Sequence, residues 1–596
     1  MSKTPRQYLP EAIAIFWVTF FFVLSSLHPY HVNGDVGLII KSVQQFVDNK
    51  SPFLQIISSP NPNDLTQNIE TWIAWFPPGI AIAFYPLMAI GLPIAIATKL
   101  TAYGLIMSGC LGWLQLGKRF RLPTLALVIA ACTLPLYSLT VSGAIKLESG
   151  DILPFSIVPW LYIYAFELGQ NYLPKTHRSN SVLYWRCCGL GLLLGSIYWL
   201  KYSAFLAACS VSFYLFFEIV WGTGQANLTT LEKIKLLLIG AIAFAIAPLM
   251  LSLINQHFTQ TVNYVEQINQ SKDLVSPNHP MGGWTPIFFL AAPGVAAFQF
   301  SLFLKHFIFY SDSWLPFFRD LEPKQRTIPL GIACLPISAL VLALVYQVRK
   351  ICTSSVWIFS LCVGFLPFFP LVYLSHSLDL NFLVMEPRYA MSHFIVVELL
   401  CLKWLVSQLS FASQRIDFTA KRIRALIILL VLVVLPSLFH GGYFLKEQIW
   451  DRRQIPHYTT TAKDLYVPSF SRVNSRAIVQ AITQTQKSAQ DVVVLALLSP
   501  ADAWLEIDQR PLVLSYGLDG VFTHTHDVGV LNIKSTQPFR TAKPLRVTLV
   551  VARELIDEPN LLSQLQNRFP QATAWHPVTD IELDIAEVGI YYADLY

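Results

Sequence analysis

Leu236–Ile254 reads LLLIGAIAFAIAPLMLSLI and contains no charged side chain. A helix of about 20 apolar residues is long enough to cross the hydrocarbon core of a bilayer. A helix also satisfies all of its backbone polar groups internally, as a membrane interior requires. The stretch is therefore predicted to be a membrane helix, and comparable apolar runs recur through residue 440.

Composition supports this prediction for the chain as a whole. Hydrophobic residues make up 54% of the sequence and charged residues 13%, whereas a soluble domain averages about 25% charged residues. The weak alternating pattern of an outer-membrane barrel is absent. The net charge of +6 is modest and gives no indication of nucleic-acid binding. We predict an all-α polytopic membrane helix bundle.

The apolar runs predict about eleven to thirteen crossings, the first of them an uncleaved helix. The predicted spans cover approximately residues 10–27, 78–116 (interrupted), 122–141, 152–168, 187–200, 202–220, 236–254, 286–304, 328–345, 356–374, 389–405 and 425–439.

Lysine and arginine in short loops predict the orientation. The N-terminus and the loops 175–186, 233–235, 349–350 and 415–424 are basic and are expected in the cytoplasm. One conflict remains. If Pro78–Leu116 crosses twice, Lys118–Arg121 falls on the wrong side, so either one piece is re-entrant or another span is miscounted.

Two domains are predicted. Residues 1–440 form the membrane domain, with a long first outer loop at 29–77 that holds an amphipathic helix at Val36–Val47 and a turn-rich loop at Ser58–Asp64. Residues 441–596 mix short β-branched runs with helical patterns, which indicates a soluble α/β domain outside the cytoplasm. The expected strands are 492–498, 513–514, 528–533, 547–551 and 581–592, and the expected helices are 477–486 and 555–569.

Asp35 is the sharpest candidate for chemistry. It follows Asn33-Gly34 shortly after the first helix, at the start of the predicted amphipathic helix. An aspartate in this place is often only an N-cap. The alternative is a general base held at the membrane face.

Polar residues beside the bilayer form a second set of candidates. Lys146, Glu148 and Asp151 lie between two predicted spans, and His31 and Glu70 lie in the first outer loop. Such residues are usually solvated, but next to the bilayer they can line a polar cavity.

Two cations lie at the edges of apolar runs. Lys201 separates two apolar halves, so it either needs an anionic partner inside one long helix or marks a turn between two. Arg388 precedes Tyr389 at the opening of a late span, and an arginine there can hold a phosphate with two parallel hydrogen bonds.

Taken in order, these motifs resemble the C-type superfamily of membrane glycosyltransferases, nearest to the protein O-mannosyltransferases and the aminoarabinose transferases. The matching pieces are the outer-loop Asn33-Gly34-Asp35, the proline pair Pro77-Pro78, the Gly-rich helix Gly191–Tyr202 that ends in Lys201, and Arg388-Tyr389. The chain departs from the aminoarabinose branch at Trp75-Phe76, where that branch has Glu-Lys.

The resemblance implies a reaction. The donor is a sugar on a polyprenyl phosphate, Asp35 is the general base, and Arg388, Lys201 and Tyr389 bind the donor phosphate. The acceptor hydroxyl belongs to a lipid, a glycan or a protein, and the anomeric carbon is inverted. No cofactor is assigned, and a divalent metal is left open. Apart from the resemblance, the compact loops and the absence of a disulfide framework favour a bacterial inner membrane; in a eukaryotic host the same topology would put the site in the lumen of the endoplasmic reticulum.

Other classes stay open at this stage. A transporter or flippase of lipid-linked sugars would carry charges within helices and a repeated half. A non-catalytic membrane protein with a binding tail, or a ligase that moves a whole lipid-linked glycan, would also fit parts of the pattern.

Overall fold

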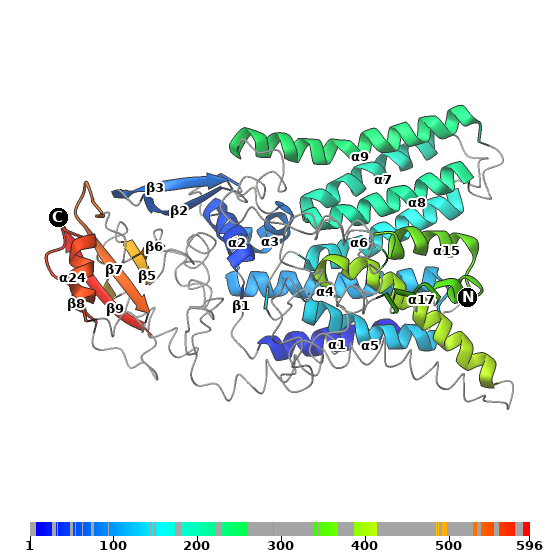
Figure 1. The fold of residues 1–596 in the computed structure, drawn as a ribbon, viewed down its shortest axis with the longest axis horizontal. Helices are drawn as coiled ribbons and strands as arrows, with labels where there is room; N and C mark the ends of the chain where they lie inside the picture. Colours follow the sequence, from blue (N-terminus) through cyan, green and yellow to red (C-terminus); the bar gives the residue numbers. More distant parts are fainter. Residues whose placement is uncertain are drawn as a thin grey trace. The chain divides into compact units, whose positions relative to one another are not determined.

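In the computed structural model the chain forms two compact units (Figure 1). The first unit comprises Met1–Phe21, Tyr103–Ala144 and Gly150–Trp450, and the second comprises Phe22–Ala102, Ile145–Ser149 and Asp451–Tyr596. The structure describes residues 8–26, 31–32, 34–47, 52–53, 55–61, 64–72, 77–92, 94–141, 146–147, 151–172, 180–221, 228–259, 290, 335–336, 338–339, 341–343, 345–367, 387–413, 484–485, 487, 492–497, 528–532, 538–552, 559–578 and 588–596.

Helices dominate the first unit, as the apolar runs predict. They are α1 (Leu9–Ser26), α4 (Ile94–Arg119), α5 (Thr124–Val141), α6 (Ile152–Glu167), α7 (Asn180–Leu200), α8 (Phe205–Trp221), α9 (Thr230–Thr259), α15 (Ser354–Ser360) and α17 (Pro387–Ser413). Helices α1 and α4 each extend into the second unit.

Three helical stretches among the described residues are long and apolar enough to cross a membrane, namely Ile152–Gln170, Ser181–Leu200 and Thr230–Phe258. The prediction of a helical membrane domain is confirmed at this level. The number of crossings stays a prediction, because the predicted span 425–439 and all of the span 286–304 except residue 290 lie outside the described residues. The domain boundary at residue 440 stays a prediction for the same reason.

Helices α1 and α4 run antiparallel. The Thr19 hydroxyl lies 3.0 Å from that of Tyr103. Nearer the start of α1, Glu11 accepts a hydrogen bond of 3.0 Å from Gln115 and forms an ion pair with Lys118. The chain that joins α1 to α4 therefore leaves and re-enters the bundle at one end. The opposite end, where Glu11 meets Lys118, is called the Glu11 end.

This arrangement removes the conflict over Pro78–Leu116. The block contains a short helix α3 (Gly79–Ala89) followed by α4. With 11 residues, α3 is only about 16 Å long, against about 30 Å for a hydrocarbon core. Of the two helices only α4, with 26 residues, has the length for a crossing, and a single crossing by this block puts Lys118–Arg121 at the Glu11 end, together with the start of α1.

Helix α6 runs parallel to α4. Trp113 donates a 3.1 Å hydrogen bond to the carbonyl of Phe155 near the start of α6, and Arg119 pairs with Glu167 at 2.6 Å at its end. Since Glu167 is at the Glu11 end, α6 begins at the other end of the bundle. Asp151, the residue before α6, pairs there with Lys201, and this end is called the Lys201 end.

Helix α17 also begins at the Lys201 end. Lys403, late in α17, donates a 2.7 Å hydrogen bond to the carbonyl of Phe120, just before α5. Halfway along, Thr133 of α5 donates at 2.9 Å to Glu398 of α17. The two helices are thus antiparallel, and α17 starts where α5 ends.

An aromatic cluster forms part of the core of the first unit. The ring of Phe359 in α15 lies 4.9 Å from Tyr214, 5.4 Å from Phe166, and 5.7 Å from both Phe120 and Tyr162, measured between centroids. The angles between ring planes are 66–82°. Edge-to-face contacts of this kind are favourable for aromatic rings, and they join α15 to α6, α8 and the turn before α5.

Two glycines bring α7 and α9 into close contact. A Cβ on Gly191 would lie 2.5 Å from the carbonyl oxygen of Gly240, and one on Gly195 would meet the carbonyl oxygen of Phe244. Small residues four apart allow such backbone approach between membrane helices. Pro248 lacks the N–H that would bond the Phe244 carbonyl within α9, which frees that carbonyl to face Gly195.

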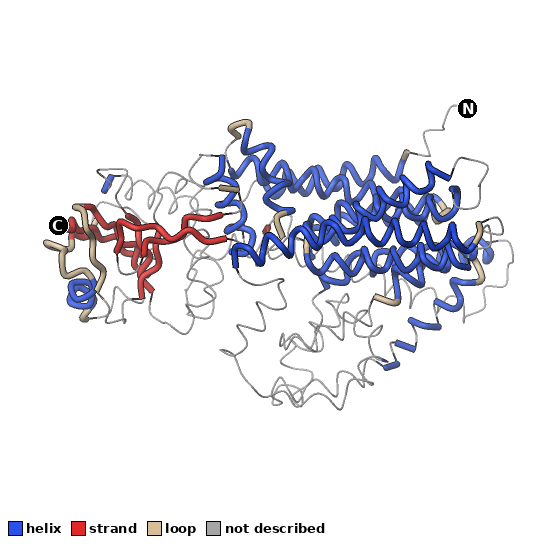
Figure 2. The backbone as a smooth tube through the Cα atoms, turned by 90° about the horizontal axis from the view of Figure 1, so that it is seen from above, coloured by secondary structure: helices blue, strands red, loops and turns tan. Residues whose placement is uncertain are grey.

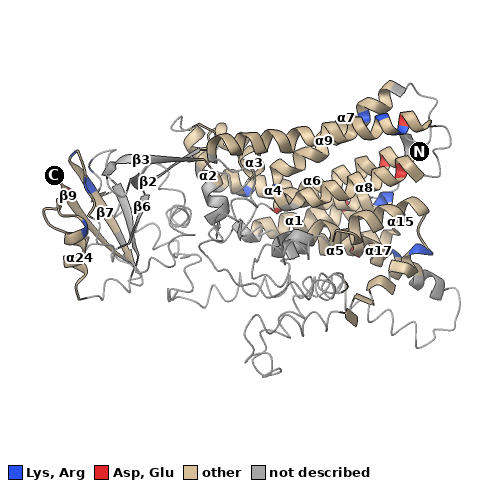
Figure 3. Cartoon of the chain, turned by 45° about the horizontal axis from the view of Figure 1, so that its top comes forward, with Lys and Arg blue, Asp and Glu red and all other residues tan. Residues whose placement is uncertain are grey.

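Basic residues mark the Glu11 end (Figure 3). Lys118 and Arg119 close α4, and Arg186 lies in the first two turns of α7, which ends at the Lys201 end. Helix α9 runs parallel to α7, so Lys233 and Lys235 in its first turns lie there too.

In the part of the chain that the structure describes, every strand belongs to the second unit (Figure 2). The predicted amphipathic helix is present as α2 (Gly34–Val47), with Ile39, Ile40 and Val43 buried. It packs on α3.

The turn-rich segment Ser58–Asp64 was expected to be a loop, and this expectation is largely wrong. Strands β2 (Gln55–Asn61) and β3 (Asp64–Trp72) form an antiparallel hairpin that includes most of it. The register shifts on both sides of Pro60. Proline has no N–H for the ladder and is tolerated at such irregularities, which explains why a strand survives these turn residues.

The end of the chain contains a five-stranded sheet and a helix, as expected for an α/β domain. The strand order is β6 (Val528–Asn532), β5 (Val492–Leu497), β7 (Leu545–Ala552), β9 (Val588–Leu595) and β8 (His576–Pro577). Strand β5 pairs in parallel with β6 and β7, whereas β9 is antiparallel to both of its neighbours. Helix α24 (Leu561–Arg568) covers one face through Leu561 and Leu565. The expected strand 513–514 lies outside the described residues.

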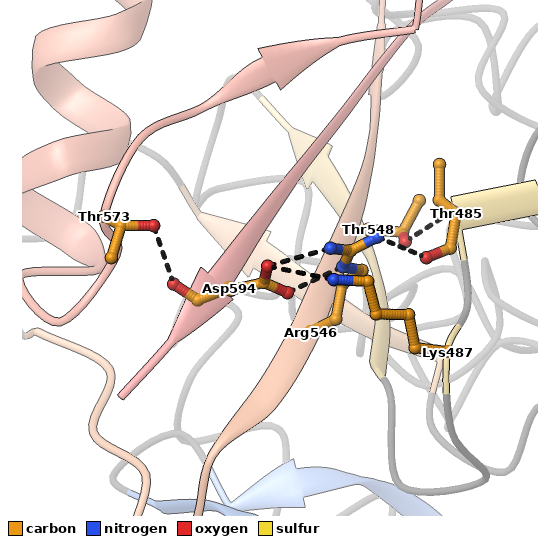
Figure 4. Close-up of polar contacts among 6 residues, drawn as sticks. All are labelled: Thr485, Lys487, Arg546, Thr548, Thr573 and Asp594. Carbon is orange, nitrogen blue, oxygen red and sulfur yellow. Dashed lines mark hydrogen bonds and ion pairs between the residues drawn. The ribbon is translucent and has the colours of Figure 1, made fainter.

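An ion pair spans β7 and β9 on the other face of the sheet (Figure 4). Arg546 donates two hydrogen bonds, of 2.7 and 2.8 Å, to the carboxylate of Asp594, and a third of 2.9 Å to the carbonyl of Thr485. Its guanidinium also lies 4.6 Å from the centre of the Tyr592 ring. The hydrogen bonds from Arg546 hold the pKa of Asp594 below its usual range.

Substitution of either close-packed glycine should loosen the bundle. We expect Gly191→Ala and Gly195→Ala to destabilise the protein by about 1–3 kcal/mol, because the added methyl group meets α9 backbone. Thermal unfolding in detergent measures the effect. Gly189→Ala is the control, since a Cβ there meets nothing within 4 Å. Equal stability of all three variants would contradict the close contact.

The Arg546–Asp594 pair should stabilise the sheet in a pH-dependent way. The pKa of Asp594 is lowered on folding, so the stabilisation is present above the unfolded pKa of about 3.9 and is lost as pH falls through the lower folded value. We expect Asp594→Asn to weaken hydrogen-exchange protection of β7 at pH 7. The difference from wild type should shrink below about pH 4. A difference that does not change with pH would contradict this.

Candidate functional site

The candidate residues that the structure describes lie mainly at helix ends. Asp35 is the second residue of α2. Arg388 and Tyr389 are the second and third residues of α17. Asp151 directly precedes α6, and Lys201 directly follows α7. Within the first unit, Arg388, Asp151 and Lys201 all belong to the Lys201 end of the bundle.

Lys201 and Asp151 form a buried ion pair. Only 2% of the Asp151 side chain and 15% of the Lys201 side chain are exposed. Asp151 makes no capping hydrogen bond to α6. The sequence predicts either that Lys201 has an anionic partner or that it marks a turn between two helices. Both are true, because the chain breaks here into α7 and α8 and Lys201 pairs with Asp151.

Burial makes this pair sensitive to any change in either member. Removing two charges from water costs several kcal/mol per ion, and their mutual attraction offsets that cost only while both are present. Loss of one partner leaves an uncompensated charge in an apolar bundle. The ion pair therefore holds the start of α6 to the end of α7, and removal of either charged side chain should destabilise the protein.

Two hydrogen bonds to α9 hold the residues on either side of Lys201 in place. Trp199 donates a 2.6 Å hydrogen bond to the carbonyl of Ala247, and Asn255 donates at 3.3 Å to the hydroxyl of Tyr202. The short 3-10 turn η3 (Tyr202–Ala204) then leads into α8. The break between α7 and α8 is thus a braced turn with the cation at its centre.

Asp35 belongs to the second unit. It lies in the first turn of α2, where the helix dipole favours negative charge. Strand β1 (His31–Val32) precedes α2 and pairs in parallel with β4 (Lys146–Leu147), so His31 lies opposite Lys146. β4 belongs to the connection between α5 and α6, so this pairing ties the segment that leads into α2 to the segment that leads toward Asp151.

The remaining candidates are placed in part. Glu70 lies in β3 opposite Ile57. Pro77 and Pro78 are buried, and Pro78 directly precedes α3. Glu148 and the pair Trp75-Phe76 lie outside the described residues. Within the described ranges, no group of three or more histidine, cysteine, aspartate or glutamate side chains is arranged to hold a metal ion.

Sequence reasoning missed two buried carboxyl groups among the described residues, Glu218 in α8 and Glu398 in α17. Glu398 is 2% exposed in the middle of α17 and accepts a hydrogen bond from Thr133. His393, also 2% exposed, bonds the carbonyl of Val363 through Nδ1 at 2.7 Å. A charge inside the apolar run Tyr389–Leu405 was a visible signal for Glu398.

Comparisons with known proteins place the chain among similar structures. No protein-family model and no curated protein matches the sequence. The chain is similar to ArnT from Cupriavidus metallidurans bound to undecaprenyl phosphate, with 13% identity and a TM-score of 0.46, over 99% of this chain and 98% of that one.

It is also similar to the oligosaccharyltransferase AglB from Archaeoglobus fulgidus in complex with an inhibitory peptide and a dolichol-phosphate. The identity is 10% and the TM-score 0.45, over 98% of this chain and 74% of that one. A further Archaeoglobus fulgidus oligosaccharyltransferase structure, with Zn and sulfate, gives 12% and 0.35, over 87% and 62%.

Breaking the Lys201–Asp151 pair should be costly. We expect Lys201→Met and Asp151→Asn each to lower stability by about 3–5 kcal/mol, and the double substitution to cost clearly less than their sum. Thermal unfolding in detergent of all four proteins gives the coupling. Arg119→Gln is the control, since the Arg119–Glu167 pair is more exposed and should contribute at most about 1 kcal/mol. Additive single effects would contradict a direct interaction.

Proposed function

We propose that this protein is a membrane glycosyltransferase. It moves a sugar from a polyprenyl-phosphate-linked donor to an acceptor hydroxyl on the extracytoplasmic side, with inversion of the anomeric carbon. The observation that carries the proposal is the buried charge at the Lys201 end of the bundle. There the buried Lys201–Asp151 pair and the start of α17, with Arg388, lie at the same end. Ionisable residues kept at membrane depth usually serve a substrate.

The sidedness follows from the basic residues. Lys118, Arg119 and Arg186 lie at the Glu11 end, and short basic segments stay in the cytoplasm. The Lys201 end is then extracytoplasmic. A donor carried by a polyprenyl chain can reach this end sideways from the bilayer, without entering water.

The first chemical step is assigned to Asp35. Its carboxylate takes the proton of the acceptor hydroxyl, whose oxygen attacks the anomeric carbon of the donor sugar. The bond from that carbon to the phosphate oxygen breaks with its electron pair, which releases polyprenyl phosphate. Attack from the side opposite the leaving group inverts the carbon. Asp35 is the second residue of α2.

The leaving phosphate gains negative charge, and cations fixed in a dry site stabilise such charge strongly. Arg388 is assigned the main contact, because its planar group can bind two phosphate oxygens at once. Tyr389 is assigned as a hydroxyl donor to the same phosphate. Lys201 has three donor hydrogens, so it can hold Asp151 and one phosphate oxygen together.

Partners and setting belong to the same proposal. The acceptor is a lipid, a glycan or a protein, and the enzyme resides in a bacterial inner membrane with residues 441–596 outside the cytoplasm. His31, Lys146 and Glu70 are assigned to the polar surroundings of Asp35, since β1 and β4 join the first two next to α2. Glu148 is kept with them on sequence grounds.

Asp35→Asn should abolish most of the transfer. Removing a general base costs roughly 10²–10⁴ in rate, while the amide keeps the shape of the side chain. Transfer of radiolabelled sugar from lipid-linked donors is measured in membranes at matched expression. Asp64→Asn, which changes an aspartate of the same outer loop at the start of β3, should retain activity.

Three other outcomes are informative. Full activity in Asp35→Asn would remove Asp35 from its role and leave the enzyme class standing. Equal losses in both variants would indicate a folding defect of the loop. Wild-type protein that gives no transfer with any donor, but moves lipid-linked sugar across reconstituted vesicles, would replace the enzyme by a transporter.

A further inference from the structure

A backbone carbonyl in the first unit lacks its ordinary helical donor. Helix α15 continues into one π-helical turn, η4 (Leu361–Phe365), in which Leu366 donates to the carbonyl of Leu361 at 3.1 Å. Pro367 follows, and proline has no N–H. In an α-helix the N–H of position 367 would bond the carbonyl of Val363, four residues earlier. The proline removes that donor from a carbonyl whose residue is completely buried.

His393 of α17 supplies a donor in its place. Its Nδ1 lies 2.7 Å from the carbonyl oxygen of Val363, and the His393 side chain is itself buried. A carbonyl oxygen can only accept, so Nδ1 carries the proton. The turn also packs closely on α17, because a Cβ on Gly364 would lie 3.2 Å from Val397 and 3.4 Å from Val396. A hydrogen bond and close packing therefore fasten η4 to α17.

This contact lies near the start of α17. Arg388 is five residues before His393, which is about 7.5 Å along the helix axis. The first N–H groups of a helix have no partner inside it, so helix ends fray unless other contacts hold them. The contacts of α17 at Glu398 and Lys403 are about 15 and 22 Å from Arg388 along the axis. They hold the middle and the far part of the helix.

We propose that His393 is a positioning residue for the donor phosphate. By tying α17 to η4 it fixes the first turns of α17, which carry Arg388 and Tyr389. The inference rests on the proposed function, which assigns the phosphate to these two residues. His393 acts through the helix and is not itself a phosphate ligand. A displacement of about 1 Å in a binding group can cost roughly 10² in rate, so a loosely held helix start should impair transfer.

Four variants separate positioning from a general loss of stability. His393→Asn keeps an N–H donor close to the place of Nδ1, and His393→Leu removes it. The double substitution His393→Leu with Pro367→Ala removes the tie to α17 but returns an N–H that can bond the Val363 carbonyl within its own helix. Thr133→Val is the control, since it breaks the contact of α17 at Glu398, away from the helix start.

Hydrogen exchange over residues 387–395, sugar transfer and thermal unfolding in detergent are measured on the full chain. We expect His393→Leu to speed exchange by roughly tenfold, because a buried hydrogen bond is lost. Its transfer should fall by about 10–10². His393→Asn should keep both near the wild-type values. The double variant should recover stability while its transfer stays low. Thr133→Val should leave exchange at the helix start and transfer close to wild type.

Unchanged exchange in His393→Leu would overturn the proposal, and so would faster exchange with full transfer. Transfer that recovers together with stability in the double variant, or an equal loss in Thr133→Val, would make His393 a purely structural residue. If His393→Leu does not fold, the double variant compared with His393→Asn decides. Wild-type protein without transfer would refute the proposed function and the link to the phosphate, whereas the exchange data would still show whether His393 holds α17.

Discussion

A charge in hydrocarbon needs a partner, and in this protein that requirement decides where helices begin and end. Lys201 stands where α7 stops, and Asp151 stands where α6 starts. Their ion pair fastens two helix ends that are 50 positions apart in the chain, 201 against 151. Glu11, with Lys118, does the same at the other end of the bundle. Between the Lys201 end and the Glu11 end the described helices are largely apolar. The charged pairs therefore set how far each helix is shifted along the bundle axis relative to its neighbours.

Much of the fold can be predicted from the sequence, because the bilayer imposes a simple pattern on it. The apolar runs Leu122–Val141 and Ile152–Leu168 match α5 and α6 nearly residue for residue, since apolar length alone defines a buried helix. The amphipathic spacing of Val36–Val47 likewise gives α2. In the block Pro78–Leu116 the predicted interruption matches the turn at Gly91, but composition does not say whether one or both of its pieces cross. Only the contacts of α4 with α1 decide that.

The hairpin at β2 and β3 shows a different limit. Serine, proline and asparagine predict a turn over Ser58–Asp64, yet the ladder runs through most of it. Pairing with a partner strand overrides the local preference for a turn, and the irregularity is confined to the register shifts around Pro60. Strand pairing depends on residues elsewhere in the chain, which a local pattern cannot report.

The candidate site was predictable residue by residue but not as a set of contacts. Asp35, Lys201 and Arg388 attract attention because each stands at the edge of an apolar run. That Asp151 is the partner of Lys201 could not be read from spacing, since any nearby carboxylate would serve. Glu398 was visible as a carboxylate within an apolar run, but its hydrogen bond from Thr133 joins positions 265 apart.

The glycine contact between α7 and α9 has an evolutionary consequence. Helix α9 carries its charges only near its ends, and it turns most of its surface outward. Yet its backbone lies against Gly191 and Gly195, and Ala247 and Asn255 hold the residues on either side of Lys201. Amino-acid substitutions in α9 are therefore constrained only on the side of the helix that contacts α7. Descendant sequences should keep small side chains at 191 and 195 while the lipid-facing positions of α9 exchange freely among apolar residues.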